Sequence, residues 1–282
     1  MTLCMLNLGF HRNLDFCLPR MKYLGANKGT ESNQHHGQRK LLLVEIDFLL
    51  DWFTHPRRDK TRTTLIVYAG AAGGHHLETL CNYFEKENCT WLLYDTTPFE
   101  CWTNKRTPDK VQKICRFFDV AEARRLYDAN KTYDILFISD IRSAVPDFAL
   151  HFQGQKEADD MRVENEILKE LSLQQTWIFE MQCKYAIMKF RLPYQYDYAS
   201  HQNVTELKYV KGEIRIQPWA RKNSTECRLV VKEDDIRDKN QEIYDCVAYE
   251  EIMCWVNHQQ RPHGLDQFLD DMIMNRLNAY LI

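Results

Sequence analysis

Hydrophobic and polar positions divide the chain into short apolar runs and longer amphipathic segments. Runs rich in β-branched or aromatic residues predict buried strands, and they cover residues 64–69, 90–95, 111–118, 133–140, 185–192, 213–219 and 226–231. Apolar residues at helical spacing predict a helix from Lys40 onward and helices over 75–87, 120–130 and 157–183, the last as one helix or two. The tail from 240 to 282 also has a helical pattern, whereas residues 1–36 have an irregular one.

The alternation of strands and helices predicts an α/β fold with a mostly parallel sheet covered by helices on both faces. The last two predicted strands have no long helix between them, which indicates an antiparallel edge. A Rossmann-like, seven-stranded methyltransferase sheet has this layout. We therefore expect residues 37–282 to form one domain with a helical C-terminal tail, preceded by the irregular segment 1–36.

Composition narrows the function classes only a little. The 282 residues are 44% apolar and 27% charged, as is usual for a globular protein. The net charge of -3 excludes a globally basic nucleic-acid binder, so any surface for RNA must be a local patch. The ten cysteines form no CxxC pair and no zinc-type spacing, which favours reduced thiols and predicts no metal site. There is no run of 18 apolar residues, so no membrane span is expected.

The stretch TLIVYAGAAGGHHLETL (64–80) joins a predicted strand to a helix through a glycine-rich turn. No lysine follows Gly74, which excludes a triphosphate cradle, and Ala72 stands at the middle glycine of a dinucleotide fingerprint. Glycine still allows close approach of the backbone to a ligand, and Asp95 at the end of the next strand could accept hydrogen bonds from ribose hydroxyls. S-adenosylmethionine, which has adenosine but no phosphate, fits this turn. An ordinary strand–helix turn with a loop acid is the alternative.

Four charged residues lie at the start, at the end or in the interior of a predicted helix or strand. Lys40 begins a helix, whose N-terminus disfavours a cation and should lower the pKa of the amine. Lys189 lies within an apolar strand, Asp140 ends a strand and Glu226 opens another. An amine with a lowered pKa can help to remove a hydroxyl proton during methyl transfer. Each residue alone is more often structural, but their order resembles the Lys-Asp-Lys-Glu signature of RNA 2′-O-methyltransferases.

Seven segments resemble, in order, the poxvirus family of cap-specific mRNA nucleoside-2′-O-methyltransferases, whose members are also the small stimulatory subunits of viral poly(A) polymerase. They are GQRKLLLVEIDFL (37–49), VYAGAAGGHH (67–76), RFFD (116–119), ILFISDIRS (135–143), KFRLPY (189–194), QPWARKNSTECRLV (217–230) and YEEIMCWVN (249–257). The resemblance implies S-adenosylmethionine as the cofactor and capped mRNA as the substrate. It also implies a poly(A) polymerase catalytic subunit as a partner and the infected-cell cytoplasm as the place of action.

The resemblance assigns roles to individual residues. The family's catalytic residues correspond to Lys40, Asp140, Lys189 and Glu226. Lys189 would activate the ribose 2′-hydroxyl and Asp140 would orient it, while the other two would tune its protonation. The family's cofactor contacts correspond to Gln38, Tyr68, Gly70, Gly74, His76, Asp95, Arg116, Phe117 and Asp140.

Recognition of the cap is also implied by the resemblance. The family holds the methylated guanine between two aromatic rings, which stack favourably on a cationic base, and acidic groups accept from its edge. Tyr194 matches one ring and Tyr23 is a candidate for the second. Glu250 matches one acid, whereas the other acid position falls on Tyr196, one residue before Asp197. The alternatives are a surface ring for Tyr194 and one face of a helix for Glu250.

Contacts with the RNA chain are expected to use phosphates and sugars without reading the bases. Candidates are the basic residues of WARKNS (219–224) and IRS (141–143). Arg142 and Arg228 match family positions and are expected either near the reacting ribose, as RNA contacts, or among neighbouring charges.

Three functional hypotheses remain open. The first is an enzyme that methylates the first transcribed nucleotide of capped mRNA. The second is an interaction protein, a polyadenylation processivity subunit with the same fold and little catalysis. The third is a methyltransferase for internal RNA hydroxyls. Because the Lys-Asp-Lys-Glu residues are all present, the sequence favours the first, which can coexist with the second.

Overall fold

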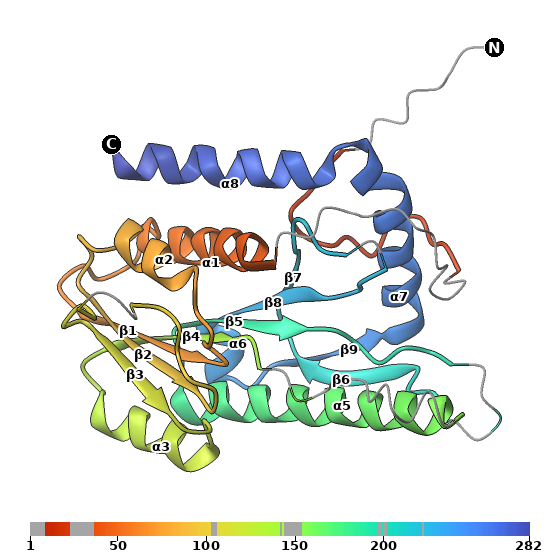
Figure 1. The fold of residues 1–282 in the computed structure, drawn as a ribbon, viewed down its shortest axis with the longest axis horizontal. Helices are drawn as coiled ribbons and strands as arrows, with labels where there is room; N and C mark the ends of the chain where they lie inside the picture. The colour runs from red at the N-terminus through yellow and green to blue at the C-terminus, as the bar shows by residue number, and fades with distance from the viewer. Residues whose placement is uncertain are drawn as a thin grey trace.

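A seven-stranded sheet forms the centre of the protein in the computed structural model, which describes residues 9–22, 37–102, 106–141, 143, 154–196, 199, 202–221 and 223–282 (Figure 1). Its strands are β1 (Thr64–Ala69), β2 (Cys89–Asp95), β3 (Val111–Cys115), β4 (Asp134–Ser139), β5 (Tyr185–Phe190), β7 (Glu213–Ile216) and β8 (Cys227–Lys232). The strand order is β3-β2-β1-β4-β5-β8-β7. Strands β1 to β5 are parallel, whereas β8 runs antiparallel to both of its neighbours. The predicted α/β class and the antiparallel edge are confirmed.

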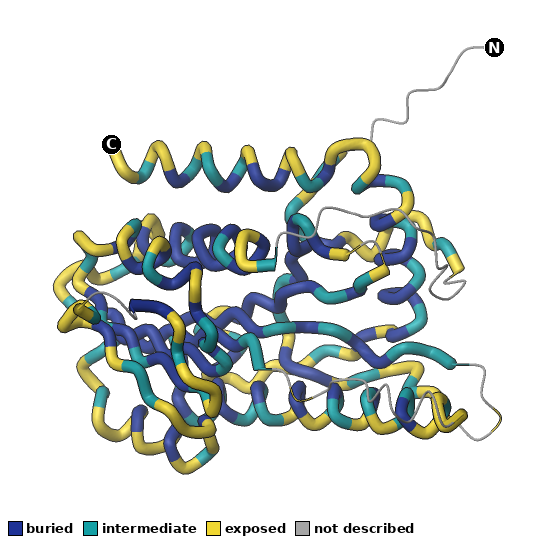
Figure 2. The backbone as a smooth tube through the Cα atoms, viewed as in Figure 1, coloured by how far each residue is buried: buried dark blue, intermediate teal, exposed yellow. Residues whose placement is uncertain are grey.

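Helices cover both faces of this sheet. They are α1 (Gly37–Phe53), α2 (Leu77–Tyr83), α3 (Val120–Ala129), α5 (Lys156–Met181), α6 (Glu233–Arg237), α7 (Cys246–Trp255) and α8 (Leu265–Leu281). Helices α1 and α2 lie on one side of the sheet with α8 above them, and α3 and α5 lie on the other side (Figure 1). The central strands are buried, while the helices expose their outward faces (Figure 2).

The period-2 alternation of strand side chains explains why the core has two layers. In β1, Leu65 and Val67 belong to the apolar cluster that contains residues of α3 and α5. The intervening Ile66 and Tyr68 belong to the cluster that contains residues of α1 and α2. All six residues of β1 are buried, as expected for a parallel strand covered on both faces.

The boundaries of several elements differ from those predicted. Helix α1 begins at Gly37, so Lys40 lies in its first turn, and the segment 157–183 forms the single helix α5. Helix α2 and strands β3 and β7 are shorter than predicted, and β8 begins one residue after Glu226.

The predicted all-helical tail is wrong at its start. Residues Gln241–Asp245 form strand β9, which pairs antiparallel with β6 (Glu206–Val210) in a separate two-stranded sheet. Beyond it, helix α7 begins after Asp245, whose side chain accepts from the amide of Ala248. Five residues are too few for periodicity to separate a strand from the start of a helix, so tertiary pairing decides here.

The described part of the N-terminal segment, residues 9–22, contains an isolated bridge from Asn13 to Arg215 and is otherwise irregular, as predicted. Leu14 is buried, and Arg12 bonds the carboxylates of Asp47 and Asp51 on α1. These contacts hold the segment against the main domain.

Candidate active site

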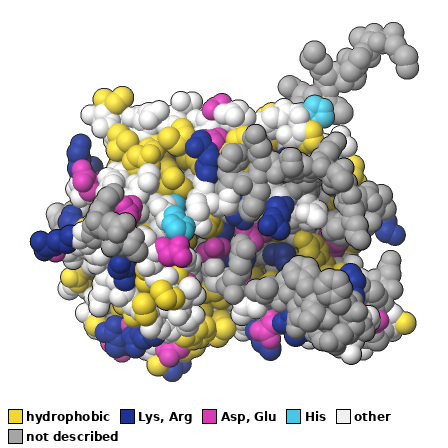
Figure 3. Space-filling view, in the orientation of Figure 1, with side chains coloured by type: hydrophobic (Ala, Val, Ile, Leu, Met, Phe, Trp, Pro, Cys, Tyr) yellow, Lys and Arg dark blue, Asp and Glu magenta, His cyan; other side chains and the backbone are white. Residues whose placement is uncertain are grey.

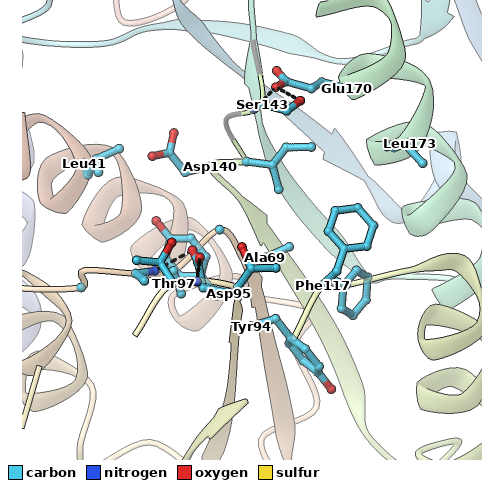
Figure 4. Close-up of a pocket in the computed structure, with 18 of the residues that line it drawn as sticks. Leu41, Ala69, Tyr94, Asp95, Thr97, Phe117, Asp140, Ser143, Glu170 and Leu173 are labelled. Atoms are coloured by element: carbon cyan, nitrogen blue, oxygen red, sulfur yellow. Dashed lines mark hydrogen bonds between the residues drawn. The ribbon is translucent and has the colours of Figure 1, made fainter. Parts of the chain in front are cut away.

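A cavity of about 760 Å³ opens at the carboxyl ends of β1, β2 and β4, a volume within the range of small-molecule sites. All nine predicted cofactor contacts line it: Gln38, Tyr68, Gly70, Gly74, His76, Asp95, Arg116, Phe117 and Asp140. These residues come from five separate segments of the chain, and the fold brings them together around one cavity. In Figure 4, Phe117 and Leu173 lie on one side of the pocket and the Asp140 carboxylate lies on the other.

The glycine turn forms part of the cavity wall and needs two of its glycines. Gly70 has a φ of +82°, and a Cβ there would lie 2.7 Å from the carbonyl carbon of Asp140. Gly74 has a φ of +74°, and a Cβ there would lie 3.0 Å from the carbonyl oxygen of Ala71. Other residues rarely adopt such angles. The turn can therefore follow β1 closely and still leave its backbone on the cavity.

Asp95, the last residue of β2, lines the pocket. Its Oδ2 accepts from the amide of Ala72 at 2.9 Å and its Oδ1 accepts from the amide of Thr97 at 2.8 Å (Figure 4). A carboxylate oxygen has more than one acceptor site, so both oxygens can also accept from hydroxyl groups of a ligand. The position and chemistry of Asp95 fit a ribose.

An apolar side of the pocket lies next to Asp95. The ring of Phe117 is 55% exposed although it lines the cavity together with Leu173 and Trp177. A large apolar ring left open at a concave site suits a flat aromatic ligand such as adenine. Arg116 is turned toward Glu122 at 2.7 Å. Together, the acid and the apolar side fit the adenosine part of S-adenosylmethionine.

The opposite part of the pocket is polar and is formed by the first turn of α1. Gln38 and Lys40 line it together with His76, which follows the glycine turn. Behind them, Glu45 of α1 is buried and contacts both His76 and Tyr68. The cavity therefore has one end suited to hydroxyl groups and a ring, and another end with cationic and amide groups.

The four predicted catalytic residues converge, although the sequence separates them by up to 186 positions. Lys40 Nζ lies 3.2 Å from Glu226 Oε1, and Lys189 Nζ lies 3.6 Å from Glu226 Oε2. The Lys189 amine also donates to the carbonyl oxygen of Ile141 at 3.4 Å, next to Asp140. Figure 3 shows charged side chains of both signs close together in the middle of this face.

Arg228 joins the two carboxylates beneath this cluster. Its Nη2 donates to Asp140 Oδ1 at 2.9 Å and lies 3.6 Å from Glu226 Oε1. Arg228 is only 3% exposed, and its backbone lies opposite that of Lys189 in the register between β5 and β8. The structure therefore places Arg228 among neighbouring charges, where its buried guanidinium pairs with the half-buried carboxylates of Asp140 and Glu226.

The pKa of Lys40 is lowered, as predicted, but the main cause differs from the predicted one. Burial lowers it most, the Glu226 carboxylate opposes this, and the Arg228 cation lowers it further.

The proposed cap residues lie on neighbouring segments after β5 and on α7. The Tyr194 ring lies 4.2 Å from the Arg191 guanidinium, and its amide donates to Glu164. Glu250 is buried, accepts from the amide of Gln195, and has a raised pKa because of burial. These contacts give Tyr194 and Glu250 structural roles, and cap binding stays a prediction. Tyr23, Arg142 and Asp197 lie outside the described residues.

Comparison with known proteins places this chain in a family. The sequence profile of the poly A polymerase regulatory subunit family matches residues 20–280. This chain is a member of that family. The chain is also 28% identical to the cap-specific mRNA (nucleoside-2′-O-)-methyltransferase of fowlpox virus over 240 aligned residues. The aligned region covers 81% of this chain and 69% of the fowlpox virus protein. The resemblance that the seven segments predict is confirmed.

Sequence reasoning missed two residues at this site. Glu45 was detectable, since it is a carboxylate on the apolar face of KLLLVEIDFLLDWF, one turn from two leucines. Gln217, just after β7, is fully buried. With its amide oriented by its partners, it donates to Glu226 at 3.1 Å and accepts from Arg228 at 3.2 Å. No sequence pattern pointed to Gln217.

Within the part of the chain that the structure describes, His, Cys, Asp and Glu side chains form no group of three or more that could hold a metal ion. Likewise, no described helix combines the length and the apolar character that crossing a membrane requires.

Proposed function

We propose that the protein transfers a methyl group from S-adenosylmethionine to the ribose 2′-hydroxyl of the first transcribed nucleotide of capped mRNA. The observation that carries the proposal is the convergence of Lys40, Lys189 and Glu226 beside Asp140, at a cavity with the predicted cofactor contacts. The name of the fowlpox virus relative supports the same reaction. A cytoplasmic place of action belongs to this proposal.

The reaction needs a proton acceptor for the hydroxyl and exact alignment of the attacking oxygen. When bound, S-adenosylmethionine would supply the methyl group as a sulfonium electrophile. The neutral amine of Lys189 would take the 2′-hydroxyl proton and become an ammonium. Glu226, 3.6 Å away, would stabilise that ammonium, while Asp140, fixed by Arg228, would orient the ribose.

A second function is supported by the family itself. The matching profile describes a regulatory subunit of poly A polymerase, so we propose the catalytic subunit of such a polymerase as a partner. The Lys-Asp-Lys-Glu cluster gives no reason for the protein to have lost catalysis, and the two roles are compatible.

The deciding experiment compares methylation of a capped short RNA with that of the same RNA without a cap. We expect the capped RNA to be strongly preferred, because the cap base adds stacking and hydrogen bonds that position the first nucleotide. The measurement is transfer of labelled methyl groups, with the modified nucleotide identified after digestion. Equal rates on both RNAs would remove the cap claim, and methylation away from the first nucleotide would favour the hypothesis of internal RNA hydroxyls.

Salt should weaken RNA binding much more than cofactor binding. RNA contacts through phosphates release counterions, and each neutralised phosphate contributes about −0.7 to the slope of log affinity against log salt. Three such contacts would reduce RNA affinity roughly tenfold or more between 50 and 200 mM salt. Titrations of a capped RNA and of S-adenosylhomocysteine at several salt concentrations measure both slopes. Equal slopes would argue against phosphate-based binding.

A further inference from the structure

A chain of four polar side chains runs from the core to the polar end of the cavity. Tyr68 Oη donates to Glu45 Oε1 at 2.6 Å, and Glu45 Oε2 lies 2.8 Å from His76 Nε2. On the other side of the imidazole, His76 Nδ1 lies 2.7 Å from Gln38 Oε1. Glu45 is 2% exposed and His76 is 6% exposed, whereas Gln38 is exposed and lines the cavity.

The arrangement of donors and acceptors determines the protonation state of the imidazole. The two ring nitrogens of His76 have different contacts: Nδ1 lies within hydrogen-bond distance of the Gln38 amide oxygen, and Nε2 lies 2.8 Å from the Glu45 carboxylate as an ion pair that is not aligned as a hydrogen bond. A doubly protonated imidazole donates from Nδ1 to the amide oxygen and places a positive charge beside the carboxylate. The amide of Gln38, whose oxygen is held by His76, then directs its NH₂ group elsewhere, and the cavity is the space that its side chain lines.

A neutral His76 would reverse this polarity. With its proton on Nε2 toward Glu45, the Nδ1 atom becomes an acceptor. The Gln38 amide would then rotate to donate to Nδ1, and its oxygen would face the ligand. The protonation state of His76 thus determines whether the Gln38 amide presents a hydrogen-bond donor or an acceptor to the cavity.

We propose that Glu45 is a positioning residue for cofactor recognition: it keeps His76 doubly protonated, and His76 in turn makes Gln38 present amide N–H donors to the carboxylate of the cofactor's amino-acid end. The inference rests on the proposed function, since it takes S-adenosylmethionine as the ligand. The carboxylate belongs at this end because Asp95 at the other end would repel it. Lys40, in the same first turn of α1, adds positive charge.

We call Glu45, His76 and Gln38 the relay. The charges around His76 favour the doubly protonated imidazole that the relay requires. Burial is the largest single influence and lowers the pKa of His76, while the Glu45 carboxylate and Asp140 together raise it more than burial and Arg228 lower it. The net pKa is raised, so the cation persists to higher pH than for an ordinary histidine. Without the Glu45 charge, the largest raising influence is lost and the pKa of His76 should fall.

The test uses two ligands that differ in the amino-acid part, which contains the carboxylate that the relay is proposed to recognise. S-adenosylhomocysteine has the amino-acid carboxylate, whereas 5′-methylthioadenosine lacks the amino-acid group. Calorimetric titrations of the wild type and of Glu45→Gln between pH 6 and 8.5 give both affinities. At pH 7.5 we expect the variant to bind S-adenosylhomocysteine roughly tenfold more weakly, the size of one charge-assisted hydrogen bond, and to bind 5′-methylthioadenosine as the wild type does.

The pH dependence separates the relay from simple packing. For the wild type, affinity for S-adenosylhomocysteine should fall as pH rises through the raised pKa of His76. In Glu45→Gln the same fall should occur at lower pH, so the affinity lost at pH 7.5 returns on acidification. Equal weakening of both ligands at all pH values would mean that Glu45 only supports packing, and would overturn the proposal.

A measurement on the wild type keeps the test decisive if Glu45→Gln fails to fold. Nitrogen-15 NMR of the His76 imidazole distinguishes the doubly protonated form from either neutral tautomer. A His76 pKa above that of an ordinary histidine supports the relay, and a His76 pKa below it overturns the proposal. A wild type that binds neither ligand would refute the methyltransferase proposal itself, whereas binding of both without any preference at low pH would refute the relay alone.

Discussion

Lys189→Ala is expected to reduce the rate of methyl transfer to capped RNA by about 100-fold or more, the usual contribution of a positioned general base. The Lys189 amine lies beside Glu226 and the backbone of Ile141, at the end of β5 where the ribose hydroxyl would arrive. Cofactor affinity should change little, because the predicted cofactor contacts are other residues. Single-turnover methylation and S-adenosylhomocysteine titration measure the two effects separately.

Lys184→Ala is the matched control for this experiment. Lys184 immediately precedes β5 at the opposite end of the strand and pairs with Glu233. The control should retain the wild-type rate. If Lys189→Ala also retained that rate, another group would have to accept the proton, and the role assigned to Lys189 would be wrong.

Arg228→Leu is expected to lower the free energy of unfolding by about 3–5 kcal/mol, because removing one partner of a buried ion pair leaves the other charge uncompensated. Arg228 is buried and bridges Asp140 and Glu226, and these contacts keep its guanidinium firmly protonated. The measurement is urea unfolding followed by circular dichroism, at pH 7.5 and at pH 5.

The loss of stability is expected at both pH values, because the Arg228 guanidinium that the variant removes is charged at both. Arg237→Leu is the control, since Arg237 pairs with Asp234 and Asp238 on the surface, and an exposed pair contributes about 0–1 kcal/mol. A loss for Arg228→Leu no larger than for the control would contradict the buried bridge.

Periodicity and turn chemistry predict the central sheet well, and the reason is visible in its strands. β1 is buried on both faces and reads as a continuous apolar run bounded by a glycine, which leaves little ambiguity. The short pair β6 and β9 alternates more weakly, with exposed positions in both strands. Its pairing depends on residues far apart in sequence, so local patterns do not predict it.

The candidate site follows the same rule. Asp95 and Asp140 are the last residues of two predicted parallel strands, so topology alone places them at one edge of the sheet. The side chain with which each charged residue pairs does not follow from topology. That Arg228 would bind Asp140, or that Gln217 would lie between Glu226 and Arg228, depends on side-chain packing among strands that only the three-dimensional structure reveals.

The reversed direction of β8 determines which part of the sequence encodes each part of the candidate site. Because β8 runs opposite to β5, its beginning, not its end, reaches the ligand edge, and Glu226 stands there opposite the end of β5. All the predicted cofactor contacts lie at or before Asp140, whereas Glu226 is encoded 86 residues later. Premature termination ahead of β8 would therefore keep every predicted cofactor contact but remove the carboxylate that lies beside both Lys40 and Lys189.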